Sequence, residues 1–262
     1  MHRPACLALW FLSACESQRT VAEEMERGLG ESNDAVLAAL LSGELLVHVD
    51  GPVAPTTPVR HDPSACGCPC LSRVGDNVPY VQTLDYATLG CIPTTGMLPT
   101  ALSGHVVLVV EDDGECDASW QDFTFALEHE VSGTFSGRSV AEGVGWRMAA
   151  LGALEVGPRT FDLDLDLVTD AGGVHVDGTV SVGPAPAGDP RQVVLRDVFV
   201  PFDAIGAPCP RPSAGTATLT DGDEAQDVSV VFDRPGDGFV VVQRKGRESE
   251  PADFCAYASE LW

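Results

Sequence analysis

Acidic and histidine side chains on two neighbouring stretches form the pattern in this chain that most suggests chemistry. The first stretch, 161–167, alternates aspartates with apolar residues, and the second, 174–182, follows a Gly172-Gly173 turn and alternates valines with polar residues. Opposed residues of an antiparallel hairpin share a face. The side chains predicted to share this face are Asp162, Asp164, Asp166, His175 and Asp177.

Every register that respects this alternation places Asp177 opposite an aspartate: Asp166 for a two-residue turn, Asp164 for a four-residue turn and Asp162 for a longer one. Opposed like charges weaken a strand pair, so their repulsion must be offset. One interpretation is an open face on which water and salt screen the carboxylates. The alternative is a bound Ca²⁺, because clustered carboxylates suit that ion.

Glu128-His129-Glu130 is a second segment whose residue types suit acid–base chemistry. Strand alternation separates these residues, since His129 shares an apolar face with Phe125 and Leu127 while both glutamates point the other way. The sequence therefore predicts a core histidine.

Cysteines supply the third candidate chemistry. Cys66, Cys68 and Cys70 are close enough in sequence to bind Cu⁺ or Zn²⁺ through thiolates, or else to form disulfides. The favoured disulfide is Cys209–Cys255, bracketing a C-terminal β unit, followed by Cys91–Cys116. The role of the three-cysteine cluster stays open between the two readings.

The first fifteen residues read as an export signal. Arg3 precedes a short apolar stretch, Ala5 to Leu12, which is too short to span a bilayer at about 20 residues. Leu12-Ser13-Ala14-Cys15 then resembles the lipobox of bacterial lipoproteins. This resemblance implies removal of residues 1–14, acylation of Cys15 and an extracytoplasmic, membrane-anchored protein. Glu16 stands where an aspartate would favour inner-membrane retention, so the outer membrane is expected.

Composition narrows the classes of partner. Acidic residues outnumber basic ones by 39 to 15, for a net charge of −24, so the surface repels phosphate backbones and nucleic-acid binding is not expected. No Gly-x-Ser-x-Gly elbow, His-Glu-x-x-His helix or phosphate-binding Gly-x-x-x-x-Gly-Lys loop occurs. No catalytic residue is therefore assigned.

The elements that would carry these residues are mostly strands. Residues 15–50 read as a tether with a short helical part, including a helix Ala35 to Leu41 stopped by Gly43 and a strand Glu44 to Val49. Residues 51–76 read as a Cys/Pro-rich loop. Residues 77–262 read as an antiparallel β domain, with a possible C-terminal unit at 205–262.

Within the β domain the expected strands are spaced by Gly and Asp turns. They are predicted at 80–86, 105–111, 123–131, 161–167, 174–182, 192–200, 215–220, 228–232 and 238–244, with a helical segment near 146–154. The expected class is all-β, as an antiparallel meander, a sandwich or a curved barrel-like sheet with a short helical N-terminal segment.

Two blocks of residues resemble uncharacterised bacterial lipoproteins. The first is Thr83-Leu84-Asp85-Tyr86 with Gly90-Cys91 and Ser103-Gly104, and the second runs from Cys209-Pro210 to Cys255. The resemblance implies an anchored all-β protein with no established activity. We therefore expect a structural or binding module with an envelope protein or glycan as partner; a calcium- or metal-binding domain and an extracytoplasmic enzyme with an unrecognised site are the alternatives.

Overall fold

The computed structural model describes residues 21–49, 70–74, 79–86, 102–111, 115–126, 130–142, 145–183, 191–204, 209–220, 227–233, 239–244, 247–249 and 251–257. These form one long α-helix, fourteen strands and a short 3₁₀ helix. The elements are α1 (Val21–Val49), β1 (Cys70–Val74), β2 (Tyr80–Asp85), β3 (Leu102–Val110), β4 (Cys116–Ala126), β5 (Glu130–Glu142), β6 (Gly145–Val156), β7 (Arg159–Thr169), β8 (Gly173–Gly183), β9 (Arg191–Pro201), β10 (Ala214–Thr220), β11 (Val228–Val231), β12 (Phe239–Arg244), β13 (Arg247–Glu248), β14 (Ala252–Asp253) and η2 (Phe254–Tyr257).

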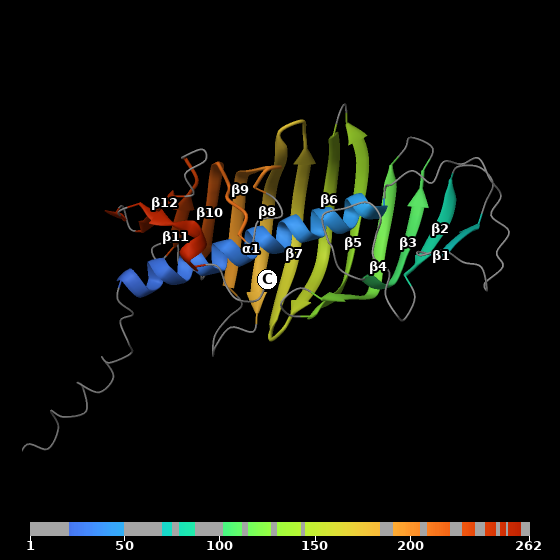
Figure 1. Ribbon diagram of the computed structural model, residues 1–262, viewed down its shortest axis with the longest axis horizontal. Coiled ribbons are helices and arrows are strands. Elements are labelled where there is room, and N and C mark those ends of the chain that lie inside the picture. Colours follow the sequence, from blue (N-terminus) through green and yellow to red (C-terminus); the bar gives the residue numbers. More distant parts are fainter. Residues whose placement is uncertain are drawn as a thin grey trace, which may run out of the picture.

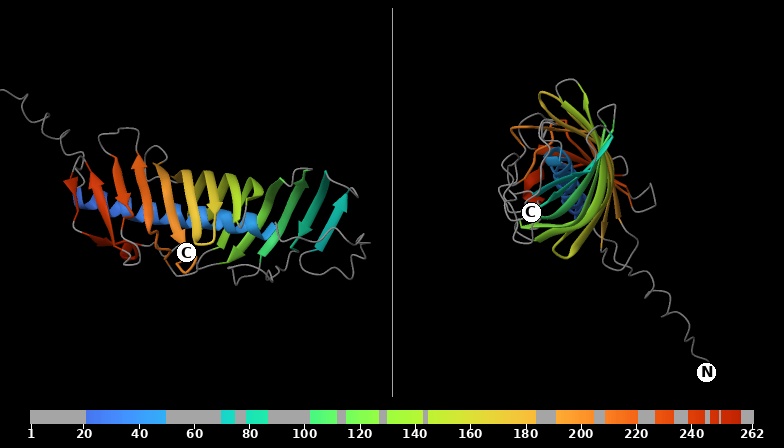
Figure 2. Two further views of the ribbon diagram at one scale, coloured as in Figure 1. Left: turned by 90° about the horizontal axis from the view of Figure 1, so that it is seen from above. Right: turned by 90° about the vertical axis from the view of Figure 1, so that its right-hand side faces the viewer.

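All strands belong to one antiparallel sheet in which spatial order follows chain order from β1 to β13, and β14 pairs with β12. The sheet curves along its length so that one face is concave and one convex, and α1 lies along the concave side (Figures 1 and 2). The predicted all-β class is confirmed, in its meander form. Strands β10 to β12 of the expected C-terminal unit continue the same sheet through the β9–β10 pairing.

Helix α1 crosses the strands and fills the concave face over β5–β12 (Figure 1). Its buried apolar side chains are alanine, valine and leucine, and they meet the inward apolar residues of the sheet. Two glycines permit close approach. A Cβ at Gly28 would lie 2.5 Å from Cγ1 of Val228, and one at Gly43 would lie 3.0 Å from Cδ2 of Leu167.

The prediction for this region was wrong in two respects. Glu44 to Val49 is helix rather than strand, and α1 continues through Gly43 for a total of 29 residues. Glycine disfavours helix, so a stop at Gly43 was expected. The helix continues because Gly43, which has no side chain, allows α1 to lie close to β7.

Three buried or half-buried ion pairs hold α1 to residues at one end of the strands. Each arginine lies at a strand end: Arg159 begins β7, Arg191 begins β9 and Arg244 ends β12. In an antiparallel meander the first residues of odd-numbered strands and the last residues of even-numbered strands lie at the same side of the sheet, so these three strand ends are on one side. The pairs are Asp34–Arg159 at 2.5 Å, Glu31–Arg191 at 2.7 Å and Glu24–Arg244. Because Glu24, Glu31 and Asp34 lie seven and three residues apart, they share one side of the helix.

Several predicted β boundaries need correction. The segment 146–154 is not helical but forms most of β6, whose Ala and Leu content gives no strand signal. The expected single strand 123–131 is divided between β4, which ends at Ala126, and β5, which begins at Glu130. Cys70 to Val74, expected in a loop, form β1. The other predicted strands are confirmed to within a few residues.

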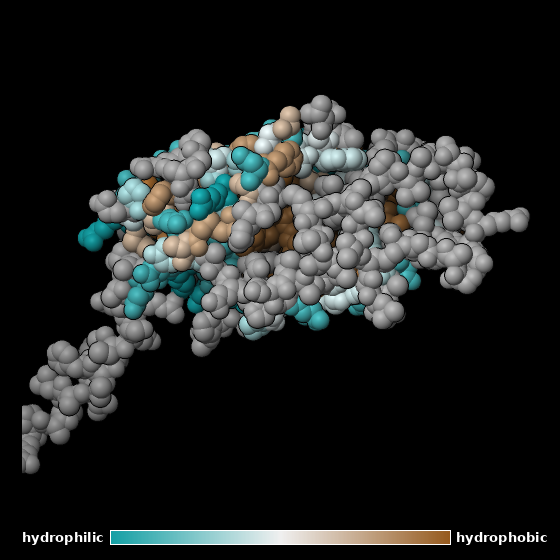
Figure 3. All heavy atoms as spheres, viewed as in Figure 1, coloured by the Kyte–Doolittle hydropathy of each residue, from teal (hydrophilic) through white to brown (hydrophobic). Residues whose placement is uncertain are grey.

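On the face that carries α1, polarity changes between the β10–β12 end and the middle. Hydrophilic side chains gather toward the end where β10–β12 lie, and apolar side chains show near the middle (Figure 3). No helix in the described ranges combines the length and apolar character needed to cross a membrane.

Candidate binding surface on the outer face of the sheet

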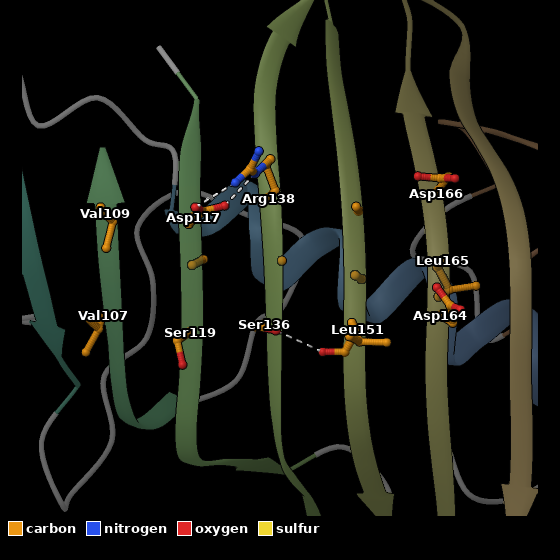
Figure 4. A pocket seen from close by; sticks show the side chains of 14 residues that line it. Val107, Val109, Asp117, Ser119, Ser136, Arg138, Leu151, Asp164, Leu165 and Asp166 are labelled. Carbon is orange, nitrogen blue, oxygen red and sulfur yellow. Dashed lines mark hydrogen bonds and ion pairs between the residues drawn. The ribbon is translucent and has the colours of Figure 1, made fainter. Parts of the chain in front are cut away.

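A depression of about 520 Å³ lies on the outer, convex side of the sheet, away from α1. Residues of five consecutive strands, β3 to β7, line it (Figure 4). Its lining is Val107, Val109, Asp117, Ala118, Ser119, Ser136, Gly137, Arg138, Ala149, Ala150, Leu151, Asp164, Leu165 and Asp166. We call it the outer-face depression.

Two cross-strand rows of outward side chains build this depression. The strand registers place Val107, Ser119, Ser136, Leu151 and Asp164 directly opposite one another in sequence across β3–β7. The same registers place a second row beside the first, made of Val109, Asp117, Arg138, Ala149 and Asp166. Short side chains on β4–β6 form the floor because serine and alanine leave room above the sheet.

The two ends of the depression differ in polarity. Val107 and Val109 on β3 give an apolar end, and Asp164 and Asp166 on β7 give an acidic one, with Leu151 beside them (Figure 4). Leu151 is 60% exposed and is the largest apolar side chain on the outward face of β6.

Arg138 is the one basic residue of the lining, and carboxylates already surround it. Its Nε and Nη2 donate to the two carboxylate oxygens of Asp117 at 2.7 and 3.1 Å, and its Nη1 donates to Glu115 at 2.8 Å. Asp164 and Asp166 make no ion pair within the described residues. The depression therefore carries a negative field that its own arginine does not cancel.

The predicted aspartate face exists, and its register is the one given by a two-residue turn. Asp166 lies opposite Asp177, whereas Asp164 and Asp162 lie opposite Thr179 and Ser181. Asp177 is engaged elsewhere, because its Oδ1 accepts a hydrogen bond from the backbone N–H of Asp197 at 2.8 Å. Among the described residues, no group of three or more His, Cys, Asp or Glu side chains is placed to hold a metal ion.

His175 shares this outer face but has a partner of its own. Its Nε2 lies 3.3 Å from Oδ2 of Asp170, and its ring packs on Phe199. The other oxygen of Asp170 accepts the backbone N–H groups of Gly172 and Gly173 at 2.6 and 3.1 Å, closing the turn. These two backbone hydrogen bonds, with a smaller contribution from His175, lower the pKa of Asp170 below its usual value.

The cysteine predictions have mixed outcomes. The Cys209–Cys255 disulfide is confirmed, with the two Cα atoms 5.7 Å apart. Cys116 is buried at the start of β4, while Cys91, Cys66 and Cys68 lie outside the described residues. The Cys91–Cys116 pairing and the role of the cluster with Cys70 therefore stay predictions, as does the lipid attachment at Cys15, which also lies outside.

Sequence reasoning found Asp164 and Asp166 but missed their neighbours. Leu151, Arg138 and Ser119 come from strands whose mutual register no local pattern specifies. His129, by contrast, was singled out but lies outside the described residues. A polar, small-residue composition at alternate positions of 117–121 and 134–138 was the only available signal for the floor.

Comparison with known proteins adds no relative. No family model, no curated protein sequence and no solved structure matches this chain. The resemblance to uncharacterised bacterial lipoproteins stays a prediction.

Proposed function

We propose that this protein is a lipid-anchored, extracytoplasmic structural or binding module that presents the outer face of its sheet to a partner. The observation that carries the proposal is the contrast between the two faces. Helix α1 occupies the concave side over β5–β12, whereas the convex side is polar, open and shaped by the outer-face depression. A wide open surface suits contact with a macromolecule better than enclosure of a small substrate.

The anchor is proposed from the residues themselves. Leu12-Ser13-Ala14-Cys15 follows a basic and apolar leader, and α1 begins at Val21, six residues after Cys15. A disulfide between Cys209 and Cys255 supports an oxidising compartment, where such bonds persist. With Glu16 after the cysteine, the outer membrane is the proposed location.

Radiolabelled palmitate tests the anchor. Cells expressing the wild-type chain or Cys15→Ala are fed the label and then fractionated. We expect a labelled wild type in the membrane fraction and an unlabelled, more slowly processed variant. An unlabelled wild type in the cytosol with all thiols free contradicts the proposal.

The partner is proposed to be another envelope component, protein or glycan, rather than nucleic acid. The net charge of −24 disfavours any polyanion. A non-catalytic role agrees with the lining of the outer-face depression, which holds serines but no histidine to act as their base.

Calcium binding is a second candidate because Asp166 and Asp177 face each other on an exposed surface. Such a pair offers few of the six to eight oxygen ligands that Ca²⁺ takes, so water would complete the shell. Calorimetric titration with millimolar calcium tests it. Heat that disappears in Asp177→Asn supports the candidate, and no heat with an unchanged melting temperature ends it.

A further inference from the structure

We propose that the outer-face depression binds an extended basic polypeptide segment whose cationic residues meet Asp164 and Asp166. This inference rests on the proposed binding function and names the ligand class for it. Three properties of the depression lead to this class of ligand: its charge, its length and the placement of its apolar side chains.

The charge of the depression selects a cation. Asp164 and Asp166 alternate on β7 and point to the same side, about 7 Å apart along the strand. No ion pair within the described residues neutralises either of them. Arg138 cannot attract an anion effectively, since Asp117 and Glu115 already hold three of its N–H groups. An ammonium or guanidinium group placed between the two aspartates would gain two carboxylate partners.

The length of the depression selects a chain rather than a small molecule. Its two rows cross five strands from β3 to β7, which corresponds to about 19 Å at 4.8 Å per strand. Its width is only two side chains along each strand. An extended peptide covers about 19 Å with roughly six residues.

The apolar side chains fix the direction of the ligand. Val107 and Val109 lie at the β3 end, and Leu151 lies beside the aspartates near the β7 end. Leu151 can cover the methylene stem of a lysine or arginine whose charged head meets the aspartates. An apolar residue about five positions away would then reach the two valines.

The lining lacks the aromatic side chains that are common in small-molecule sites, since none of its fourteen residues is aromatic. The backbone groups of β3–β7 are consumed by the sheet ladders, so the peptide cannot add as a strand there. Recognition depends on side chains and is expected to be salt-sensitive.

The test uses the full chain and a fluorescent ten-residue peptide with two leucines at one end and two arginines five residues further on. Binding is measured by fluorescence anisotropy in 50 and 500 mM NaCl. Asp164→Asn/Asp166→Asn is compared with Asp162→Asn, which removes an exposed carboxylate from the same strand and face but outside the lining. Unchanged melting temperatures show that all variants are folded.

We expect the double variant to bind at least tenfold more weakly, equivalent to about 1.4 kcal/mol, and Asp162→Asn to change binding less than twofold. Leu151→Ser is expected to weaken binding about threefold, and high salt to weaken it in the wild type. A peptide with glutamates in place of the arginines should not bind.

Three results would overturn the inference. The first is no binding of the basic peptide. The second is equal weakening by Asp162→Asn, which would show attraction by overall charge alone. The third is a glucosamine oligomer that binds through Asp164 and Asp166 while the peptide does not. Each is independent of palmitate labelling at Cys15, so failure of the ligand assignment is distinguishable from failure of the anchor.

Discussion

Acidic residues lie on both sides of the sheet, and the two sides differ in whether these residues are buried and ion-paired. On the concave side, Asp34 and Glu31 of α1 are buried, and each pairs with an arginine at a strand end. On the convex side, Asp164 and Asp166 are exposed, and the described residues offer them no cation. A buried charge must be compensated, whereas an exposed one remains available. The comparison separates acids that hold the fold from acids that can meet a ligand.

The largest decrease in the free energy of unfolding is expected on the concave side, from removal of the Cys209–Cys255 disulfide. This disulfide closes a loop across 46 residues and brings η2 beside α1, so its removal by Cys209→Ser/Cys255→Ser is expected to cost about 4 kcal/mol through chain entropy. Denaturant unfolding of the double variant and of the reduced wild type measures this loss. Equal stability with and without the bond would show that the disulfide does not help to hold η2 against α1.

Breaking one buried ion pair should cost nearly as much. Arg159→Met leaves the carboxylate of Asp34, only 1% exposed, without its cation, and we expect a loss of about 3 kcal/mol in the free energy of unfolding. Arg138→Met is the matched control on the convex side, where the pair is exposed and the expected loss is below about 1 kcal/mol. Similar losses in both variants would remove the distinction between the faces.

Two glycines of α1 allow a test of how closely the helix packs against its neighbours. Gly28→Ala places a Cβ 2.5 Å from Val228 and is expected to destabilise by about 1–2 kcal/mol despite the better helix propensity of alanine. Gly30→Ala meets only the carbonyl oxygen of Tyr257 at 3.6 Å, so it should stabilise by up to about 1 kcal/mol. Thermal melts of both variants test the pair, and a stabilising Gly28→Ala would contradict the close contact with β11.

The smallest expected effect is a pH dependence at the β7–β8 turn. The pKa of Asp170 is lowered in the folded state by the N–H groups of Gly172 and Gly173. Its contribution to stability is therefore complete above the unfolded pKa and is lost as pH falls through the folded one. NMR titration of the carboxylate carbon should give a midpoint below 3.8, the ordinary value, and Asp170→Ala should remove that part of the acid dependence. A midpoint at or above the ordinary value would contradict the turn geometry.

The sequence predicted what depends on neighbours along the chain. The alternation at 161–167 and 174–182 predicted the β7–β8 hairpin and left three registers open, of which the structure has the one that pairs Asp166 with Asp177. It failed where distant contacts decide. Apart from Gly152, the residues from Ala149 to Leu154 favour helix, yet they lie between β5 and β7 and take the conformation of the sheet.

The outer-face depression shows the same division. Asp164 and Asp166 were recognisable from period-two alternation, but Leu151 joins them only through the β6–β7 register and Arg138 only through the β5–β6 and β6–β7 registers. The ion pairs of α1 were missed because the arginines follow Glu31 and Asp34 by 160 and 125 residues. No local pattern connects residues so far apart.

The sequential strand order has a consequence for how the molecule is assembled. Each strand bonds to the one made just before it, so the sheet can grow by short-range hairpin steps with little entropic penalty. Helix α1 is synthesised first, yet its partners β11, β12 and η2 come last. During translation β5–β10 can cover part of the apolar side of the helix, but the part that meets β11, β12 and η2 stays uncovered until the final strands are made, so the late-formed end of the sheet completes folding.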